Sequence, residues 1–150
     1  MFSFEADTKE LQKVFDKLLR IDASKQLQRG FTSALRSFTT LNKKVHNYKD
    51  QTGKLSKSHD FVQNRLRGAL RANTPYAIFV HEGTKRHFIK PKKAGALAWM
   101  QGGVMRFSKG HYVSGITPRL WIWNNLLNNF DNFSDITTAP LWKSITKALQ

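Results

Sequence analysis

The sequence predicts an α+β fold with a long N-terminal helix packed on an antiparallel sheet, a short inserted helix and C-terminal helices. Three observations predict this order. Apolar residues recur at helical spacing before residue 48, alternate with polar ones or flank glycine turns between residues 65 and 107, and return to helical spacing after residue 117. The chain has 150 residues, a length that suits one domain, so we expect residues 1–150 to form a single domain.

Two helices are predicted first. Asp7 and Glu10 form a capping-box pattern, and apolar residues follow it at helical spacing: Leu11, Val14, Phe15, Leu18 and Leu19. A longer helix is predicted from near Ser24 to about Asn47, and its apolar stripe consists of Leu27, Phe31, Ala34, Leu35, Phe38, Leu41 and Val45. Such a stripe packs most often on the chain's own sheet and less often against a partner helix.

After the turn at Gln51-Thr52-Gly53 the pattern changes to that of a strand. From residue 65 to residue 71, Leu66 and Leu70 face one side, and the arginines face the other: Arg65, Arg67 and Arg71. This alternation predicts a half-buried strand with an arginine-lined outer face. Gly68 within it indicates a bulge or a close approach of another part of the chain.

A short helix is predicted from Pro75 to Glu82, closed by Gly83, although residues 76–80 also suit a strand. Strands are predicted next at residues 86–90, 95–101 and 104–107. Gly102-Gly103 is typical of a two-residue hairpin turn, so the last two of these strands should pair in antiparallel fashion.

A loop from Ser108 to Gly115 then leads to a helix that starts at Thr117-Pro118. Its apolar residues are Leu120, Trp121, Trp123, Leu126, Leu127 and Phe130, and its polar side is formed by Asn124, Asn125, Asn128 and Asn129. After Ser134-Asp135, a last short helix is predicted from about Pro140 to Leu149.

Charge is the strongest compositional feature, with 25 basic against 10 acidic residues and a net charge of +15. Between Asp60 and Asp131 the one carboxylate is Glu82. The same stretch carries Arg65, Arg67, Arg71, Lys85, Arg86, Lys90, Lys92, Lys93, Arg106, Lys109 and Arg119. Such an excess attracts nucleic acid, an anionic membrane surface or an acidic protein, and the alternative is a solvated basic surface.

Composition also excludes several classes of site. The chain has no cysteine, so disulfides, thiolate zinc sites and thiol nucleophiles are excluded. No apolar run reaches the length of a membrane span, and we expect a soluble protein without a membrane partner. His81-Glu82 begins like a zinc-protease motif, but Lys85 stands where the second histidine is required. We therefore expect no metal, no cofactor and no catalytic residue.

One enzymatic alternative remains open. His81, Glu82, Arg86 and His87 would serve as base, acid and phosphate clamp in a small basic, metal-independent ribonuclease or toxin. The competing interpretation makes Glu82 a structural anion surrounded by arginines and lysines. A third hypothesis is an accessory protein that binds DNA without sequence specificity, because lysines and arginines contact phosphates without reading bases.

Four segments in the middle of the chain resemble, in the same order, the motifs of one protein family. They are Thr52-Gly53-Lys54-Leu55-Ser56-Lys57-Ser58, Tyr76-Ala77-Ile78-Phe79-Val80-His81-Glu82-Gly83-Thr84, Phe88-Ile89-Lys90-Pro91-Lys92-Lys93-Ala94-Gly95-Ala96-Leu97 and Gly115-Ile116-Thr117-Pro118-Arg119-Leu120-Trp121. The family comprises the neck and tail-completion (head-tail joining) proteins of tailed double-stranded-DNA bacteriophages. The chain departs from the family pattern where Glu82 directly precedes Gly83 and where Leu120 replaces a proline.

The resemblance implies a virion structural protein that is not an enzyme. It would be assembled in the host bacterial cytoplasm and located in the virion neck, as a homo-oligomeric ring of about six or twelve copies through which DNA passes. Its partners would be a head-closure or connector protein and a tail terminator or tail-tube protein. The candidate inter-subunit or partner contacts are Glu82, Arg65, Arg67, Arg71, Arg86, Trp121 and Trp123. The candidate residues facing DNA or an acidic partner are Lys85, Lys90, Lys92, Lys93 and Lys109.

Overall fold

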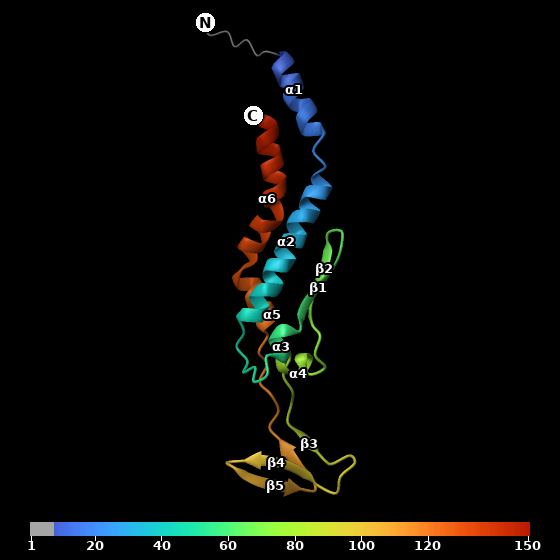
Figure 1. Cartoon of the computed structure of the whole chain (residues 1–150), viewed down its shortest axis with the longest axis vertical. Helices are drawn as coiled ribbons and strands as arrows, with labels where there is room; N and C mark the ends of the chain where they lie inside the picture. The colour runs from blue at the N-terminus through green and yellow to red at the C-terminus, as the bar shows by residue number, and fades with distance from the viewer. Residues whose placement is uncertain (1–7) are drawn as a thin grey trace.

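A computed structural model describes residues 8–150, which form an elongated molecule with the helices and one strand hairpin along one part and the other strands at the far end (Figure 1). The first two predicted helices are confirmed as α1 (Thr8–Leu19) and α2 (Ala23–Lys44). Asp22 caps α2, because its side chain accepts a hydrogen bond of 2.9 Å from the backbone N–H of Lys25. The predicted cap of the first helix, Asp7, lies outside the described residues.

The apolar stripe of α2 packs mainly against another helix, α6 (Phe130–Leu149), and less extensively against strand β1 (His59–Asn64). The two helices approach closely at Gly30, where an added Cβ would collide with the carbonyl of Thr137. Further along, the ring of Phe133 meets Phe31 and Phe38 edge to face, with centroids 6.0 and 6.2 Å apart. The apolar stripe of α2 therefore packs mainly against a helix, the arrangement described above as less common, and not mainly on a sheet.

The C-terminal helix is longer than predicted. We expected a helix to begin at Pro140, but Pro140 lies inside α6, which starts ten residues earlier at Phe130. Proline at the start of a helix is favourable, whereas in the interior it removes one backbone hydrogen bond. The half of α6 before Pro140 is held by its packing on α2, so tertiary contacts outweigh the local signal.

Asparagine side chains join α2 to α5 (Trp121–Asn128) inside the protein. The Asn125 amide donates to Oδ1 of Asn42 at 3.0 Å and to the carbonyl of Val45 at 2.8 Å, and Asn125 and Asn42 are both buried. Asn125, which we assigned to the polar side of its helix, is therefore buried and bonded inside the protein. A buried amide with satisfied donors fixes the position of one helix against the other.

A hairpin lies beside α2, formed by β1 and β2 (Arg67–Ala72). Asn64 pairs with Arg67, so Arg65 and Leu66 form the turn, and Arg65 has a left-handed φ of 54°. The predicted strand therefore begins at Arg67, not at Arg65, and β1 was not predicted. Gly68 stays in continuous register without a bulge, and it allows the close approach of α2, because an added Cβ would lie 2.7 Å from Cδ1 of Leu35.

The structure also contains α3 (Lys54–Lys57) and β6 (His111–Val113), which were not predicted. The elements that follow the predicted order are α4 (Ala77–His81), β3 (His87–Ile89), β4 (Leu97–Gln101) and β5 (Val104–Ser108). Gln101 pairs with Val104, which confirms the two-residue turn at Gly102-Gly103. The predicted loop from residue 108 to 115 instead contains β6, which pairs with β3.

The α+β class is confirmed, although in residues 8–150 the strands form three separate two-stranded sheets and not one sheet: β1–β2, β3–β6 and β4–β5. No helix in this part of the chain is long and apolar enough to cross a membrane. The expectation of a single domain over residues 1–150 stays a prediction.

Residues 84–116, which contain β3 to β6, form a projection that we call the arm, at the lower end of Figure 1. Its two ends meet at an isolated β-bridge in which Thr84 and Ile116 exchange backbone hydrogen bonds of 2.9 and 3.1 Å. In the described part of the chain, the strands of the arm make their extensive contacts with one another and not with the helices. We call the remaining described residues the helical body.

Candidate interaction surfaces

Trp121 is the centre of the helical body, not a surface contact. It is 2 % exposed and packs with Tyr48, Leu55 and Ala77. Its indole Nε1–H donates to Nε2 of His59 at 2.9 Å. Of the two interpretations of this tryptophan, interface or core, the structure therefore favours the core.

His59 is held in one neutral form by two hydrogen bonds. Its Nε2 accepts from Trp121, and its Nδ1 lies 2.9 Å from the carbonyl of Ser56, so Nδ1 carries the hydrogen. Burial lowers the pKa of His59 below its usual value. A protonated ring would place an N–H against the Trp121 donor, so this core requires the neutral imidazole.

Tyr48 closes the other side of the tryptophan, with ring centroids 4.7 Å apart and an edge-on arrangement. His46 stacks on Tyr48 at 4.0 Å. Burial, and to a lesser degree the charge of Asp50, raises the pKa of Tyr48 to about 12, so the phenol stays neutral. This aromatic cluster therefore joins the end of α2 to α5.

His81 ends α4 inside the same cluster, with its ring centroid 4.7 Å from that of Trp121. Its backbone carbonyl accepts hydrogen bonds from the N–H groups of Arg119 and Leu120, at 3.0 and 3.1 Å. Leu120 has a left-handed φ of 48°, and α5 starts after it. The predicted start at Thr117-Pro118 is therefore too early, because Arg119 and Leu120 bind the His81 carbonyl before the helix begins at Trp121.

Glu82 lies on the surface beside this core. Its carboxylate is 2.8 Å from Nδ1 of His81, and its side chain is 58 % exposed. Within residues 8–150, His81 is its one partner at ion-pair distance. The interpretation of Glu82 as an anion surrounded by arginines and lysines is therefore wrong, and the carboxylate is accessible to another molecule.

The four residues of the ribonuclease hypothesis point to different places. The ring of His81 is buried against Trp121, whereas His87 is exposed and its Nδ1 donates to the carbonyl of Lys85 at 2.9 Å. The guanidinium of Arg86 lies over the ring of Tyr112, 4.7 Å from its centroid. No described contact joins His81 or Glu82 to Arg86 or His87, so this arrangement does not favour RNA cleavage.

The arginines of the β1–β2 hairpin do not form one uniform face. Arg71 pairs with Asp60 of the neighbouring strand at 3.0 Å, and this hydrogen bond lowers the pKa of Asp60. Arg67 is exposed in β2, and Arg65 is exposed in the turn. Two of the three predicted arginines, Arg65 and Arg67, thus have no acidic partner within residues 8–150 and are accessible to one.

The arm collects the basic residues that we predicted to face DNA or an acidic partner: Lys85, Lys90, Lys92, Lys93 and Lys109. All five are exposed. Together with Arg86 and Arg106 they make seven basic residues in residues 84–116, a segment that has no carboxylate. Residues 94–105, which include the turn of the β4–β5 hairpin, carry no charge at all.

The β4–β5 hairpin has one face inside the arm and one face in solvent. Opposite residues of an antiparallel pair share a face, and Trp99 turns toward β6, with its ring 4.8 Å from that of His111. Two other cross-strand pairs, Met100 with Met105 and Ala98 with Phe107, form the opposite face. All four residues are exposed, and Phe107 reaches 70 %. We call these four residues the outer face of the hairpin.

An apolar groove lies where the arm joins the helical body. Its volume is about 480 Å³, and it is lined by Tyr76, Phe79, Val80, Thr84, His87, Val113, Gly115 and Ile116. Phe79 and Val80 come from α4, directly before His81 and Glu82. The groove therefore places apolar side chains within a few residues of the exposed Glu82 carboxylate.

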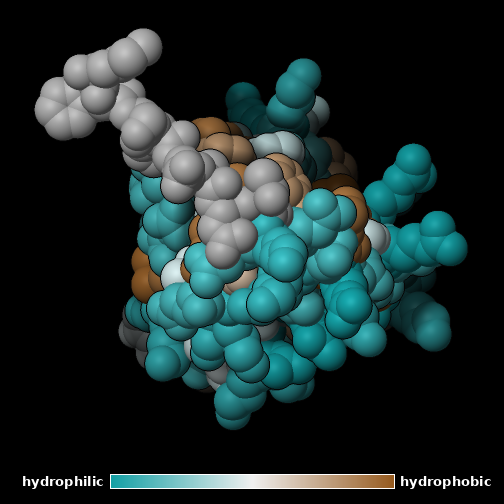
Figure 2. Space-filling view, turned by 90° about the horizontal axis from the view of Figure 1, so that it is seen from above, coloured by the Kyte–Doolittle hydropathy of each residue, from teal (hydrophilic) through white to brown (hydrophobic). Residues whose placement is uncertain are grey.

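Large apolar side chains are also exposed on the helices. On α1 they are Leu11, Phe15 and Leu19, and along α5 and the start of α6 they are Trp123, Leu127 and Phe130. Trp123 is 56 % exposed, so it stays a candidate contact, unlike Trp121. Seen from the end that carries α1, hydrophobic groups interrupt an otherwise hydrophilic surface (Figure 2).

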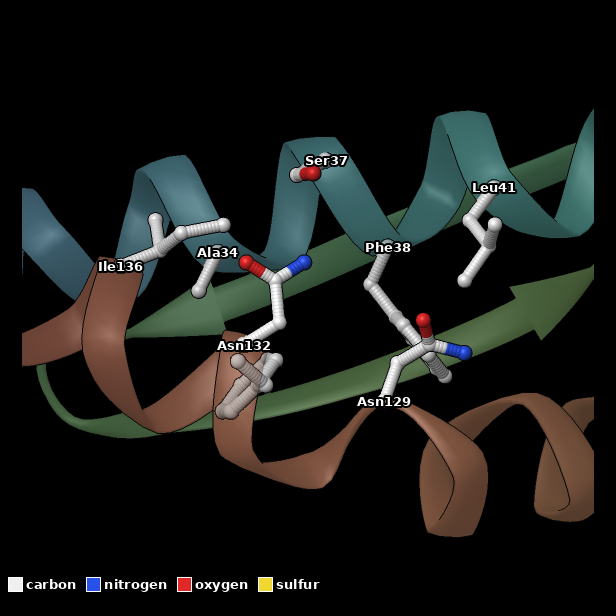
Figure 3. Close-up of a pocket in the computed structure, with 8 residues that line it drawn as sticks. Ala34, Ser37, Phe38, Leu41, Asn129, Asn132 and Ile136 are labelled. Carbon is white, nitrogen blue, oxygen red and sulfur yellow. The ribbon is translucent and has the colours of Figure 1, made fainter.

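A smaller cavity between α2 and α6 has a volume of about 70 Å³. Figure 3 shows Asn132 and Asn129 of the C-terminal segment facing Ala34 and Phe38 of α2. Its size suits one or two water molecules and not a substrate. Within residues 8–150 no group of three His, Cys, Asp or Glu side chains is placed to hold a metal ion.

Sequence reasoning singled out the basic residues of the arm and named Glu82 as a candidate contact, but it missed the exposure of Glu82, the outer face of the hairpin and the groove. The signal available for the outer face was the charge-free run of residues 94–105 between basic segments. Comparisons of the chain with family models, curated proteins and solved structures give no match. The resemblance to phage neck proteins thus stays a prediction.

Proposed function

We propose that this chain is a structural subunit of a tailed-phage neck, in which copies form a ring that joins the head connector to the tail and lets DNA pass. The ring would contact a head-closure or connector protein on one side and a tail terminator or tail-tube protein on the other. In this function the subunit supplies matched surfaces and breaks no bond. The virion neck would be its location, after assembly in the host bacterial cytoplasm.

The observation that carries the proposal is the surface area of the isolated chain. Its accessible surface is 12,139 Å² at a mass of 17.3 kDa. A compact monomer of this mass exposes roughly 7,800 Å², which leaves an excess of roughly 4,300 Å². A stable interface buries about 800 Å² on each partner. The excess is therefore large enough for two lateral contacts and for contacts with proteins above and below a ring.

The distribution of the exposed apolar side chains supports unlike contacts on different sides of the subunit. Such side chains lie on α1, on α5 and on the outer face of the hairpin, which are separate parts of an elongated molecule (Figure 1). A ring closes through heterologous contacts, in which one patch of each copy meets a different patch of the next. Exposed patches of this kind mark interaction sites.

The charge of the arm supports a negatively charged neighbour. Seven basic residues without a carboxylate would face either the phosphates of DNA in the lumen or the acidic surface of an adjoining ring. The candidate residues for this contact are Lys85, Lys90, Lys92, Lys93 and Lys109. The interaction would be electrostatic and independent of DNA sequence, because phosphate contacts do not read bases.

The test is the assembly state of the full chain, measured by mass photometry over a range of concentrations and by negative-stain microscopy. We expect closed rings of about six or twelve copies. A chain that stays monomeric and binds DNA with steep salt dependence would overturn the ring and favour an accessory DNA-binding protein. Cleavage of structured RNA in the presence of a chelator, lost in H81A and H87A, would favour the ribonuclease.

A further inference from the structure

The outer face of the β4–β5 hairpin is an apolar surface without a partner in the described chain. Met100, Met105 and Phe107 stand exposed on it, while the opposite face of the hairpin packs through Trp99 inside the arm. The opposite face contacts β6 through the rings of Trp99 and His111. No described segment makes an extensive contact with the outer face, and exposed apolar patches of this kind mark interaction sites.

The groove at the base of the arm is a second apolar surface, and it differs from the first in shape. It is concave, has a volume of about 480 Å³, and includes Phe79 and Ile116, which are themselves exposed. Pockets that bury a ligand usually have volumes of about 300–1,000 Å³, so several large side chains can enter it. One chain thus carries both a projecting apolar face and an apolar groove.

We infer that the outer face of the hairpin of one copy docks in the groove of the next copy. This inference rests on the ring proposed above and assigns its lateral contact. The two surfaces lie on different parts of the chain, and in the proposed ring this contact is heterologous and repeats from copy to copy. The occupant of the groove is therefore a second copy of this chain.

Charge favours this occupant in spite of the net charge of +15. The four residues of the outer face are uncharged, and Arg106, which stands between two of them, belongs to the opposite face of the hairpin, so the docked face itself brings no like charges together. Glu82, the one carboxylate between Asp60 and Asp131, lies two residues from Val80 and Thr84, which line the groove. Lys109 directly follows the incoming strand β5 and is exposed, which gives the exposed Glu82 a cation to pair with.

The absence of cysteine in the chain makes a direct test possible. Phe79→Cys places one thiol in the groove, and Met105→Cys places one on the outer face. When the two single variants are mixed and oxidised, a disulfide between them must join two molecules. We expect the mixture to give several-fold more crosslinked dimer on a non-reducing gel than either variant alone.

The matched control is Val104→Cys, the neighbouring residue on the same strand, whose side chain belongs to the opposite face of the hairpin. We expect its mixture with F79C to crosslink no more than the single variants do. Equal crosslinking of V104C and M105C would overturn the assignment, because it would indicate random collision. Crosslinking of F79C with Phe15→Cys in place of M105C would also overturn it, and would assign the groove to α1.

A second variant separates this inference from the proposed function. Met105→Lys introduces a charge on the outer face at a half-exposed position, so the fold should be retained, which circular dichroism verifies. We expect loss of the rings in M105K. Normal rings from M105K, without the crosslink between F79C and M105C, would overturn the docking and leave the ring intact. A natural chain that is monomeric at every concentration would overturn both.

Discussion

The helical body and the arm use large apolar side chains in opposite ways. In the body, Trp121 is buried among Tyr48, His59 and His81, with its one polar hydrogen bonded. In the arm, Phe107 and its neighbours on the outer face stand in solvent. The body thus buries its central apolar side chains, whereas the arm leaves those of the outer face exposed. The difference is the one expected if the docking inferred above covers the outer face of the hairpin, while the body buries its apolar side chains on folding.

The largest expected effect comes from removing the centre of the body. Trp121→Ala deletes a buried ring and leaves His59 without its donor, so we expect a loss of about 3–5 kcal/mol in the free energy of unfolding. Denaturant titration followed by circular dichroism measures it. Trp123→Ala is the matched control on the same helix and should change stability by less than about 0.5 kcal/mol, because that side chain is exposed. Equal losses would contradict the assignment of Trp121 to the core.

A smaller effect, confined to the arm, is expected at its base. Gly115 has a φ of +88°, and a Cβ there would collide with the carbonyl oxygen of Thr84. Gly115→Ala should therefore destabilise the arm by about 1–3 kcal/mol. Hydrogen exchange should become faster in residues 84–116 while the helices keep their protection. Gly95→Ala is the control, because nothing lies within 4 Å of its added Cβ and its φ is not positive.

The pH dependence of stability should come from the body. Burial lowers the pKa of His59 in the folded state, so the unfolded chain binds a proton at higher pH than the folded chain does. Its contribution to stability is complete above about pH 6.5, the ordinary value, and is lost as pH falls toward the folded pKa. We expect denaturant midpoints to decrease from pH 7.5 to pH 5.

His87→Gln should keep this dependence, because His87 is exposed on the arm. Asp50 and Asp60 do not contribute in this range, since their pKa values are lowered by hydrogen bonds from the backbone of Ser56 and the side chain of Arg71. An unchanged midpoint between pH 7.5 and pH 5 would show that the neutral imidazole is not required.

The smallest effect is expected at Glu82, and it should appear in assembly. The carboxylate is exposed, so Glu82→Ala should change monomer stability little, by about 0–1 kcal/mol. Ring formation, measured by mass photometry, should require several-fold higher protein concentration. Asp135→Ala, which removes an exposed carboxylate of α6, serves as the control. Rings that form equally well in both variants would remove Glu82 from the contact.

Sequence patterns predicted the elements whose signals lie within one short stretch of the chain. The stripe from Leu27 to Leu41 predicted α2, and Gly102-Gly103 predicted the β4–β5 turn, because spacing and turn chemistry suffice for both. By contrast, β6 has three residues and exists through its pairing with β3, more than twenty residues earlier in the chain. Pro140 indicated a helix start, but the packing of Phe133 on α2 extends the helix before it.

The candidate surfaces also divide into features with a local sequence signal and features that depend on contacts between distant segments. The excess charge of the arm and the isolation of Glu82 are readable in the composition of the chain. The burial of Trp121 and the exposure of Trp123 are not, since both residues belong to one apolar helix and only the neighbouring segments decide which is covered. The groove combines residues from α4 with both ends of the arm, so no single stretch of sequence contains it.

The bridge between Thr84 and Ile116 makes the arm a separable part of the chain. Both ends of the arm leave the body at one pair of backbone hydrogen bonds, so residues 84–116 form an insertion with adjacent ends. Exchanging this insertion for one of another length or surface should change what the arm presents, while the core around Trp121 stays intact.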